Sequence, residues 1–476
     1  MSAVDTVIQL VYLAAATCFV LGLHLMNSPA TARRGNQVSA TGMAAAIIAT
    51  GVLVARAGTV TVTGWVVLVA GCVIGAAAGL VSARRVAMTA IPQLVSLFNA
   101  VGGGAAAIVA MHDFIGRATA AGHPHIAARD SVPTVLDVII GAVTFAGSLI
   151  ASGKLQGLVS SSPIVFPGVR ALNIVLTAVM LGGGAFLIGA RPTGAAAVLW
   201  LMAVLVAALA FGVTMVLPIG GADMPVVISL LNAFTGTAVA MAGFVIENQV
   251  LIISGALVGA SGGILTKLMA DAMNRSIPAI IIGGFGTGDN AVVAGPAGGS
   301  VREVKADDAA IQLAYASKVI IVPGYGLAAA QAQHEVRELA DLLESRGVDV
   351  TYAIHPVAGR MPGHMNVLLA EANVPYALLK EMEEVNPDFS RADLALVIGA
   401  NDVINPAARR PGNPVSGMPI LDVDHAKSVI VIKRSMGQGY AGIDNELYAD
   451  PKTGMYFADA KKGLAELAAA VKTLVG

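Results

Sequence analysis

Long apolar runs fill the first part of the chain, and short alternating runs replace them after about residue 309. Because the hydrocarbon core of a bilayer is about 30 Å thick, a helix needs about 20 mostly apolar residues to cross it. Nine segments approach this length and predict transmembrane helices, the second of them being short. They lie near residues 4–26, 40–55, 60–83, 92–114, 132–152, 169–190, 194–217, 224–246 and 249–272.

The composition agrees with a membrane protein that ends in a different kind of domain. Of the 476 residues, 56% are hydrophobic and 12% are charged, whereas soluble domains contain about 25% charged residues. Charged residues become frequent only after about Arg302. We therefore divide the chain into a transmembrane domain at 1–275, a linker at 276–308 and an α/β domain at 309–476. The first segment has no basic leader and no cleavage site, so it reads as a retained span.

Lys and Arg in the short loops predict the orientation of the spans. With the N-terminus outside, the inner loops carry more basic residues than the outer loops, and nine spans then deliver the last domain to the cytoplasm. The inner residues are Arg33, Arg34, Arg84, Arg85, Lys154, Arg170 and Arg275, and the outer residues are Arg56, Arg117, Arg129 and Arg191.

Two further properties limit the function classes. Cys18 and Cys72 lie inside predicted spans, where a cysteine usually serves as a small buried hydrophobe, so we expect no disulfide and no metal site. The net charge is -1 without a basic stripe, which gives no reason to expect nucleic acid as a partner.

An internal repeat relates two of the predicted spans. The stretch PQLVSLFNA recurs as PVVISLLNA, and a glycine follows each asparagine by four residues, at Gly103 and Gly236. Each span therefore carries an amide at membrane depth, Asn99 in the first and Asn232 in the second. Polar groups are costly in lipid and tend to face a bundle interior or a water path. The pair indicates a proton path, with simple packing of helices through the amides as the alternative.

Two acids border or enter the predicted spans. Asp223 lies at the entrance to the second repeat span, on the inner side, and is either a proton acceptor or a solvated loop acid. Asp137 lies one turn into its span after Pro133 and is a secondary candidate of the same type. Gly255 and Gly259 have the small-xxx-small spacing that lets helices approach closely.

From about Ala309, short β-branched runs alternate with helical stretches, which predicts a parallel α/β sheet. The predicted strand Lys318–Pro323 runs directly into GYGLAA, and a helix is expected to follow through about Ser345. In a G-x-G-x-x-A turn of this kind, the glycines let the backbone approach a pyrophosphate and the helix N-terminus faces its charge. A turn that merely needs glycines is the alternative.

The next strand and a later one bear on the choice of dinucleotide. Strand Asp349–Ile354 ends at His355 with no acid to hold a ribose 2′-hydroxyl, and this argues for a 2′-phosphate, hence for NADP. Lys433, Arg434 and Ser435 follow another predicted strand. Two cations and a hydroxyl at a strand end suit a phosphate dianion, and an exposed basic pair is the alternative.

Polar residues also follow the strand Leu394–Ile398. Ligands of open α/β sheets bind outside the C-terminal ends of the strands, so Asn401 and Asp402 are placed to touch a cofactor. An aspartate at this position is also suited to capping a helix. The glycine-rich stretch 437–442 has the composition of a flexible lid.

Together these residues resemble the NAD(P) transhydrogenase beta subunit family over essentially the whole chain. The most specific stretches are VPGYGLAAAQAQHEV, HPVAGRMPGHMNVLLAEA, GANDVINPAA and PGNPVSGMPILDVDHAKSVIVIKRSMGQGYAG. The resemblance implies that the last domain is Rossmann-like and holds NADP(H). The implied contacts are Gly324, Tyr325, Gly326, Ala329, Val357, Gly359, Arg360, Met361, Gly399, Asn401, Asp402, Lys433, Arg434, Ser435, Gly439, Tyr440 and Ala441.

The resemblance also assigns roles in proton movement. It implies that Asp402 couples the nucleotide state to protonation, and that Asp223, Asn232 and Ser261 belong to the proton path, with Asn99 at an equivalent place. Several family members carry a proton-binding histidine where this chain has Asn99. Because asparagine does not titrate, we predict that the partner subunit supplies the missing group.

The implied activity is hydride transfer from NADH, on a separate alpha subunit, to NADP+ on this chain as a proton enters the cytoplasm. The implied partner carries the NAD(H) domain and further transmembrane helices, in a dimer of alpha–beta units within the lipid of a bacterial inner membrane. No second dinucleotide fingerprint occurs in this chain, which agrees with the need for a partner. Direct hydride transfer needs no nucleophile or metal, so we expect no catalytic acid or base.

Two other functions compete with this interpretation. A transporter or channel gated by a cytoplasmic NADP(H)-binding domain would bind the nucleotide without oxidising it, but the spans lack a selective pore motif or a charged pathway. A reductase that uses its spans only as anchors would not need nine glycine-rich spans with a repeated asparagine.

Overall fold

The computed structural model describes residues 3–26, 29–87, 90–120, 126–160, 163–220, 223–273, 276–283, 301–359, 363–411, 415–437, 439, 441 and 443–475. This part of the chain forms two compact units, one built mainly from long apolar helices and one built around a β-sheet. Each unit is described by itself.

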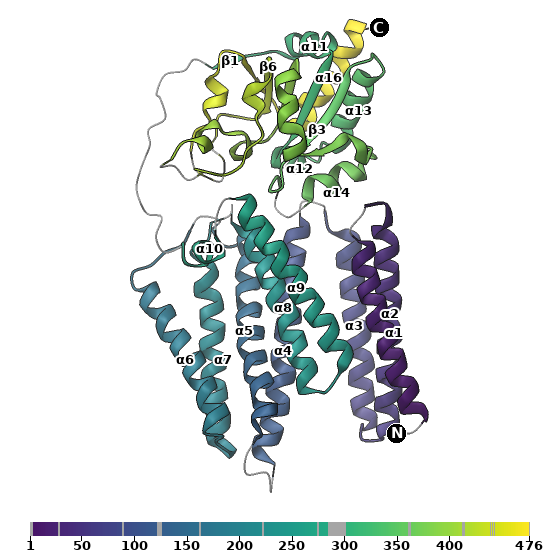
Figure 1. Ribbon diagram of the computed structural model, residues 1–476, viewed down its shortest axis with the longest axis vertical. Helices are drawn as coiled ribbons and strands as arrows, with labels where there is room; N and C mark the ends of the chain where they lie inside the picture. The colour runs from purple at the N-terminus through teal and green to yellow at the C-terminus, as the bar shows by residue number, and fades with distance from the viewer. Residues whose placement is uncertain are drawn as a thin grey trace. The chain divides into compact units, whose positions relative to one another are not determined.

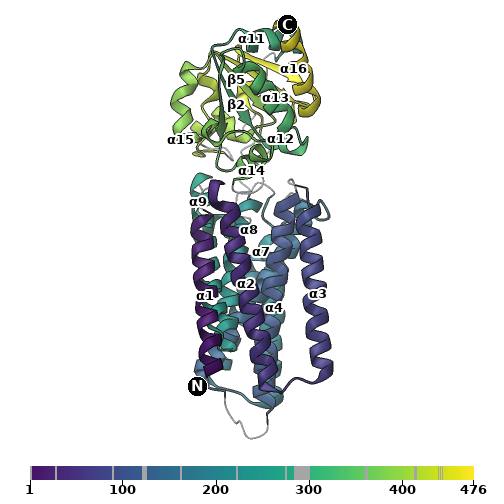
Figure 2. The same ribbon diagram turned by 90° about the vertical axis from the view of Figure 1, so that its right-hand side faces the viewer.

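The described residues include nine helices that are long and apolar enough to cross a membrane, as predicted, and they lie side by side (Figures 1 and 2). Helix α2 is longer than the predicted 40–55, because the polar turns around Arg33 and Arg34 continue the helix ahead of its apolar part. A short helix α10, Ile277–Gly283, follows the bundle. The nine are α1 Ala3–Leu25, α2 Pro29–Ala57, α3 Val62–Arg85, α4 Ile91–Thr119, α5 Ala128–Leu155, α6 Val169–Gly189, α7 Gly194–Val216, α8 Met224–Val245 and α9 Gln249–Ala272.

Glycines allow the backbones of neighbouring helices to touch. A Cβ atom on Gly141 of α5 would lie 2.5 Å from the carbonyl oxygen of Gly103 on α4. A Cβ on Gly212 of α7 would lie 2.5 Å from the carbonyl oxygen of Val143 on α5, and one on Gly255 of α9 would lie 2.4 Å from a backbone nitrogen of α8. No side chain fits at these contacts, so the small residues set the spacing of the bundle.

The sequence repeat corresponds to two helix pairs built alike. Ser96 of α4 donates a hydrogen bond to the carbonyl oxygen of Ser148 on α5, at 2.8 Å. At the equivalent position of α8, Ser229 donates to the carbonyl oxygen of Gly262 on α9, at 3.3 Å. The repeat glycine of each first helix also packs against the backbone of the second. The repeat therefore describes α4 with α5 and α8 with α9.

Helices α1 and α2 form a hairpin, in which the hydroxyls of Tyr12 and Thr50 lie 2.8 Å apart. Cys18 of α1 is half-buried next to Gly42 of α2. Helix α3 has no buried residue, and Cys72 on it is exposed. The expectation of two buried cysteines is therefore wrong for Cys72, because no other helix of the described chain covers its side of α3.

The second unit contains a seven-stranded sheet in which every pair is parallel. The strand order is β1-β7-β6-β5-β2-β3-β4. Without the edge strand β1, this is the 3-2-1-4-5-6 order of the dinucleotide-binding fold, in which the strand order reverses between its first and fourth strands. The strands are β1 Arg302–Glu303, β2 Lys318–Pro323, β3 Asp349–Ile354, β4 Leu379–Glu381, β5 Leu394–Ile398, β6 Ser428–Lys433 and β7 Thr453–Phe457.

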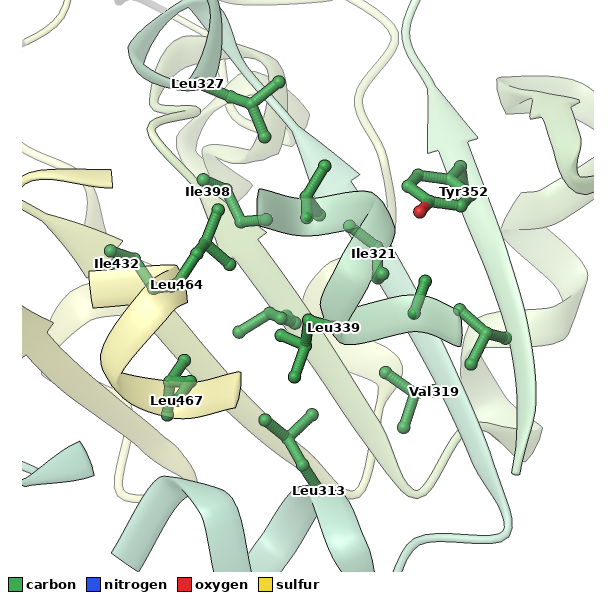
Figure 3. Close-up of a cluster of buried hydrophobic side chains, with 14 of the residues drawn as sticks. Leu313, Val319, Ile321, Leu327, Leu339, Tyr352, Ile398, Ile432, Leu464 and Leu467 are labelled. Carbon is green, nitrogen blue, oxygen red and sulfur yellow. The ribbon is translucent and has the colours of Figure 1, made fainter. Parts of the chain in front are cut away.

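Alternate residues of the strands point to two cores on opposite faces of the sheet. Figure 3 shows one face, where Leu313 of α11 and Leu339 of α13 lie over strand residues such as Ile321. The other face holds a separate buried cluster that includes Phe389. This two-sided burial explains why the central strands read as continuous apolar runs. The covering helices on the first face are α11 Ala306–Ala314, α13 Gln333–Glu344, α14 His364–Glu371 and α16 Ala460–Val475.

The helix predicted from the glycine turn to about Ser345 is in fact two helices. Helix α12 covers only Tyr325–Ala329, and α13 begins at Gln333. Gln331 between them has a left-handed backbone, with φ of 50°, and Ala332 is fully buried. The alanine-rich sequence favours one helix, but burying Ala332 in the core requires the chain to turn, and the tertiary contact prevails.

Replacement of Gly141 by alanine should destabilise the bundle by about 1–3 kcal/mol, because the new methyl group overlaps the backbone of α4. Gly182→Ala is the matched control, since no atom lies within 4 Å of the corresponding Cβ on α6. Thermal unfolding in detergent would measure both. Equal melting temperatures for the two variants would contradict the close contact of α4 with α5.

Candidate functional site

The turns after β2 and β5 meet at the carboxyl edge of the sheet. These strands are neighbours, with Pro323 paired to Ile398 at their ends, and the order of the sheet reverses between them. A crevice for ligands forms at such a switch point in open α/β sheets. The structure therefore brings the predicted residues around Gly324 together with those around Gly399.

The glycines of this turn are used for close packing. The amide of Gly324 donates to the carbonyl oxygen of Ile398 at 2.9 Å, and the amide of Gly326 donates to that of Gly399 at 3.0 Å. A Cβ on Gly324 would lie 2.4 Å from the Cα of Ala400. Gly399 has φ of 63°, a conformation that favours glycine. Packing therefore accounts for these glycines whether or not a ligand lies against them.

The other fingerprint residues lie on α12. Tyr325 is half-buried and Ala329 is exposed. The third small residue of such a fingerprint normally lets the helix approach the sheet, but Ala329 makes no such approach because α12 ends there.

The described residues between Lys433 and Ala441 fold back onto the turn after β5. The amide of Ala441 donates to Oδ2 of Asp402 at 3.1 Å. A Cβ on Gly439 would lie 2.3 Å from Oδ1 of the same carboxylate, so only glycine fits there. The ammonium of Lys433 donates to the carbonyl oxygen of Gly437. We call residues 433–437, 439 and 441 the latch segment.

The basic end of β6 combines buried and exposed polar groups. Lys433 is half-buried, while Arg434 and Ser435 are exposed. Burial lowers the pKa of Lys433, and the carboxylates of Asp402 and Asp444 act in the opposite direction. A half-buried ammonium next to an exposed guanidinium and hydroxyl is a suitable environment for an anion.

Two residues that the sequence did not single out organise this edge. The hydroxyl of Tyr448 donates to Oδ1 of Asn401 and to the carbonyl oxygen of Ala400, each at 3.0 Å. Asn445 donates from Nδ2 to the carbonyl oxygen of Asn401 at 3.0 Å, and the ammonium of Lys433 lies 4.7 Å from the centre of the Tyr448 ring. Burial, with Asp402 nearby, raises the pKa of the Tyr448 hydroxyl, which keeps it a neutral donor.

The turn after β3 is held by a buried histidine. Nε2 of His355 lies 2.8 Å from the carbonyl oxygen of Pro419, and the amide of Val357 donates to Nδ1 at 3.2 Å. Gly359 has φ of 100° and packs on His364. The turn thus reaches the same edge of the sheet with Val357 half-buried. Of the predicted contacts, Arg360, Met361 and Tyr440 lie outside the described residues.

In the bundle, Asn99 lies at the contact between the two repeat helices. Its side chain is 4% exposed and donates to the carbonyl oxygen of Ile228 on α8 at 3.3 Å. Thr235 of α8 donates back to the carbonyl oxygen of Asn99, also at 3.3 Å. These two bonds connect α4 with α8.

The other predicted membrane residues differ from Asn99 in their surroundings. Asn232 is half-buried on α8, and Asp223 is half-buried immediately before that helix. Ser261 donates within its own helix, to the carbonyl oxygen of Val258 at 3.2 Å. Among these bonds, only those of Asn99 cross from one helix to another.

Known proteins similar to this chain share one description. The family model for the NAD(P) transhydrogenase beta subunit matches residues 8–470. NAD(P) transhydrogenase subunit beta of Rhodospirillum rubrum is 48% identical over 458 residues, which are 95% of this chain and 96% of the relative. A second protein of that name, from a defined strain of the same species, matches to the same extent.

Acid should destabilise the second unit through His355. Burial lowers the pKa of this ring to about 4, against about 6.5 in an unfolded chain. As the pH falls below about 6.5 the unfolded chain binds the proton first, so up to about 3 kcal/mol of unfolding free energy is lost on reaching pH 4. Above pH 6.5 the effect is absent.

The whole chain is exposed to urea at each pH, and a short pulse of protease then cleaves the unfolded molecules. The surviving fraction of residues 301–475 gives the unfolding free energy of the second unit. His355→Gln should lower stability at pH 7.5 by about 1 kcal/mol through its weakened hydrogen bonds, yet flatten the acid slope. The control is His334→Gln, at an exposed position on α13. An acid slope that is the same in all three proteins would contradict the role of His355.

Proposed function

The chain belongs to the NAD(P) transhydrogenase beta subunit family, and on this premise we propose that its residues 301–475 bind NADP(H) while the alpha subunit binds NAD(H). The chain is a multi-pass membrane protein, the family uses both dinucleotides, and a beta subunit works with an alpha subunit. The proposal depends mainly on one observation. The turns after β2 and β5 and the latch segment come together at the point where the strand order reverses.

The residues at this edge suit an NADP(H) molecule. Lys433, Arg434 and Ser435 supply two cations and a hydroxyl for the 2′-phosphate. The turns of Gly324 to Ala329 and of Val357 to Gly359 border the same edge and hold the remaining dinucleotide in this proposal. Arg360 and Met361, which lie outside the described residues, are proposed as further contacts. Once bound, the nucleotide supplies a nicotinamide ring that gives or accepts a hydride.

The chain's own residues position the dinucleotide and exclude water. Tyr448 and Asn445 hold Asn401 in a fixed orientation. We assign Gly439 and Ala441 to a lid over the site, together with Tyr440, which lies outside the described residues. No side chain here has to act as a nucleophile or a general acid, because orientation and exclusion of water are what direct hydride transfer requires.

We assign the coupling of this site to proton movement to Asp402. Its carboxylate accepts a hydrogen bond from Ala441, and protonation weakens that bond, so the charge of Asp402 changes how firmly the latch segment is held. Nucleotide affinity and protonation are then linked reciprocally. Asp223, Asn232, Ser261 and Asn99 form the membrane part of the proton path in this proposal.

Membership of the family also underlies our proposals for the location and the assembly of this chain. The excess of basic residues in the inner loops supports a cytoplasmic second domain, in a bacterial inner membrane. The assembly is a dimer of alpha–beta units. The exposed apolar surface of α3 is available to lipid and to the helices of the alpha subunit.

Turnover in sealed vesicles tests the proposal. Vesicles containing this chain and its alpha subunit would receive NADPH and an NAD+ analogue, with the lumen pH followed at the same time. Hydride transfer with a pH change that an uncoupler abolishes is the expected result. Tight NADPH binding without any turnover would instead support a transporter gated by the nucleotide.

Lys433→Met should weaken NADPH binding about 10- to 100-fold, because a charged hydrogen bond to phosphate is lost. NADH lacks that phosphate, so its weak binding should not change. Lys427→Met is the matched control, since Lys427 precedes the other end of β6 and pairs with Asp393 at 2.8 Å. Calorimetric titration would measure the affinities, and equal losses in both variants would contradict the phosphate site.

Asp402→Asn and Asp223→Asn should each reduce proton pumping at least about tenfold, because neither amide can change its charge. Lumen pH in the vesicles described above gives the rate. Asp459→Asn, at an exposed position of the same domain, should pump like the unmodified chain. Unchanged pumping in both Asp402→Asn and Asp223→Asn would exclude these residues from coupling.

A further inference from the structure

Asp137 is a fully buried acid inside the membrane-spanning helix α5, one turn after Pro133. Its exposed fraction is 0%, and neither carboxylate oxygen has a hydrogen-bond partner within the described residues. An ionisable side chain inside a transmembrane segment is costly and is retained mainly where it has a function. None of the residues assigned above needs this carboxyl for packing or for nucleotide binding.

The helical spacing places Asp137 on the face of α5 that meets α4. Gly141 and Thr144 of α5 both contact Gly103 of α4. Asp137 lies four residues before Gly141 on the same face. Gly141 also contacts Ala107 of α4. Asp137 lies one turn before Gly141 on α5, so it lies next to the apolar residues of α4 that follow Ala107.

Charged groups on the surrounding helices lie only near the helix ends. On α4, Asp113 pairs with Arg117 at 2.8 Å, and Arg117 also pairs with Asp130 at the start of α5. Arg129 pairs with Glu247, just beyond α8. His112 of α4 is exposed. Helices α7 and α8 contain no charged residue, and the single charge of α6 is Arg170 in its first turn.

Asp137 therefore has no counter-ion among the described residues, and the nearest ionic cluster is the one around Asp130. Asp130 lies seven residues earlier, about 10 Å along the helix. Thr134 stands between them on the same face and donates to the carbonyl oxygen of Asp130 at 2.8 Å. A short polar route thus connects Asp137 with the end of α5 that carries the ionic cluster.

Hydroxyl groups continue this face of α5 on the other side of Asp137. Thr144 and Ser148 are fully buried and Ser152 is nearly so. The hydroxyl of Ser148 has no hydrogen-bond partner among the described residues, and its carbonyl oxygen accepts from Ser96 of α4. Ser96 lies one turn from Asn99, so the hydroxyls lead to the contact between α4 and α8.

We propose that Asp137 is an intramembrane proton-binding residue, which exchanges protons with the Asp130 end of α5 and with the Thr144–Ser148 side of the same face. Its carboxylate accepts one proton, becomes a neutral carboxyl and releases that proton onward, without electron transfer. The inference depends on the proposed function, because it presumes proton movement through this bundle. It places a titratable group inside the bundle of this chain, at the acid that the sequence indicated as a secondary candidate, in addition to the group expected from the partner.

Three substitutions of Asp137 separate titration from packing. Asp137→Glu and Asp137→Gln have the same size but only the first titrates, and Asp137→Asn is nearly isosteric with the native residue. Each is assembled with the alpha subunit in sealed vesicles, and lumen pH and NADPH binding are measured. The control is Asp5→Asn, a partly exposed acid in the first turn of α1.

We expect Asp137→Asn and Asp137→Gln to lose at least about tenfold in pumping rate while they still bind NADPH, and Asp137→Glu to pump with a shifted pH profile. Pumping by the Asn or Gln variant at the native rate would overturn the inference, as would equal loss in the Glu and Gln variants. If the native assembly turns over without moving protons, the proposed function itself fails, whatever the variants do.

Infrared difference spectra give a second readout that does not require turnover. The native assembly should show a carboxyl band that appears at low pH and disappears at high pH, and this band should be absent in Asp137→Asn and present in Asp5→Asn. A native spectrum identical to that of Asp137→Asn across the whole pH range would overturn the inference.

Discussion

The approach of two turns, those after β2 and β5, is the contact on which the proposed nucleotide site depends. Gly324, Gly326 and Gly399 let these turns touch backbone to backbone, at distances that leave no room for a Cβ. This contact fixes where β5 ends, and thereby where Asn401 and Asp402 stand. The latch segment, Tyr448 and Asn445 are in turn attached to those two residues. Widening the glycine contact would therefore displace every polar group at the switch point.

Glycine also permits close backbone contact in the helical bundle, where the surrounding solvent is lipid rather than water. Lipid cannot satisfy a polar group, so hydroxyls and amides within the spans must find partners in protein. Ser96, Ser229 and Asn99 do so by donating to carbonyl oxygens of neighbouring helices. Such bonds form only where the backbones come close, which the nearby glycines permit. The repeated serine and glycine therefore make the same kind of packing contact in both helix pairs.

The sequence predicted features that depend on local pattern and missed those that depend on distant contacts. Nine apolar spans and the central strands were predicted because hydrophobic runs specify them directly. The break after α12 was missed, because the burial of Ala332 outweighs the helix preference of an alanine-rich stretch. Tyr448 was missed because nothing near it in the sequence indicates that its hydroxyl reaches Asn401. The bond from Asn99 to Ile228 spans 129 positions, and the repeat only hinted that the two helices are related.

The energy that one proton delivers and the energy of one hydrogen bond are similar, so a coupling switch can consist of very few groups. One proton that moves down 100 mV contributes about 2.3 kcal/mol, and a hydrogen bond to a charged group contributes about 1.5–3 kcal/mol. The bond between Asp402 and Ala441 is thus of the same order as the energy that one proton delivers. A coupling device therefore does not need to rearrange the sheet, whose central strands are buried on both faces. In the proposed coupling, the charge of the Asp402 carboxylate decides whether the latch segment stays attached, and the buried strands of the sheet supply the fixed support against which that change acts.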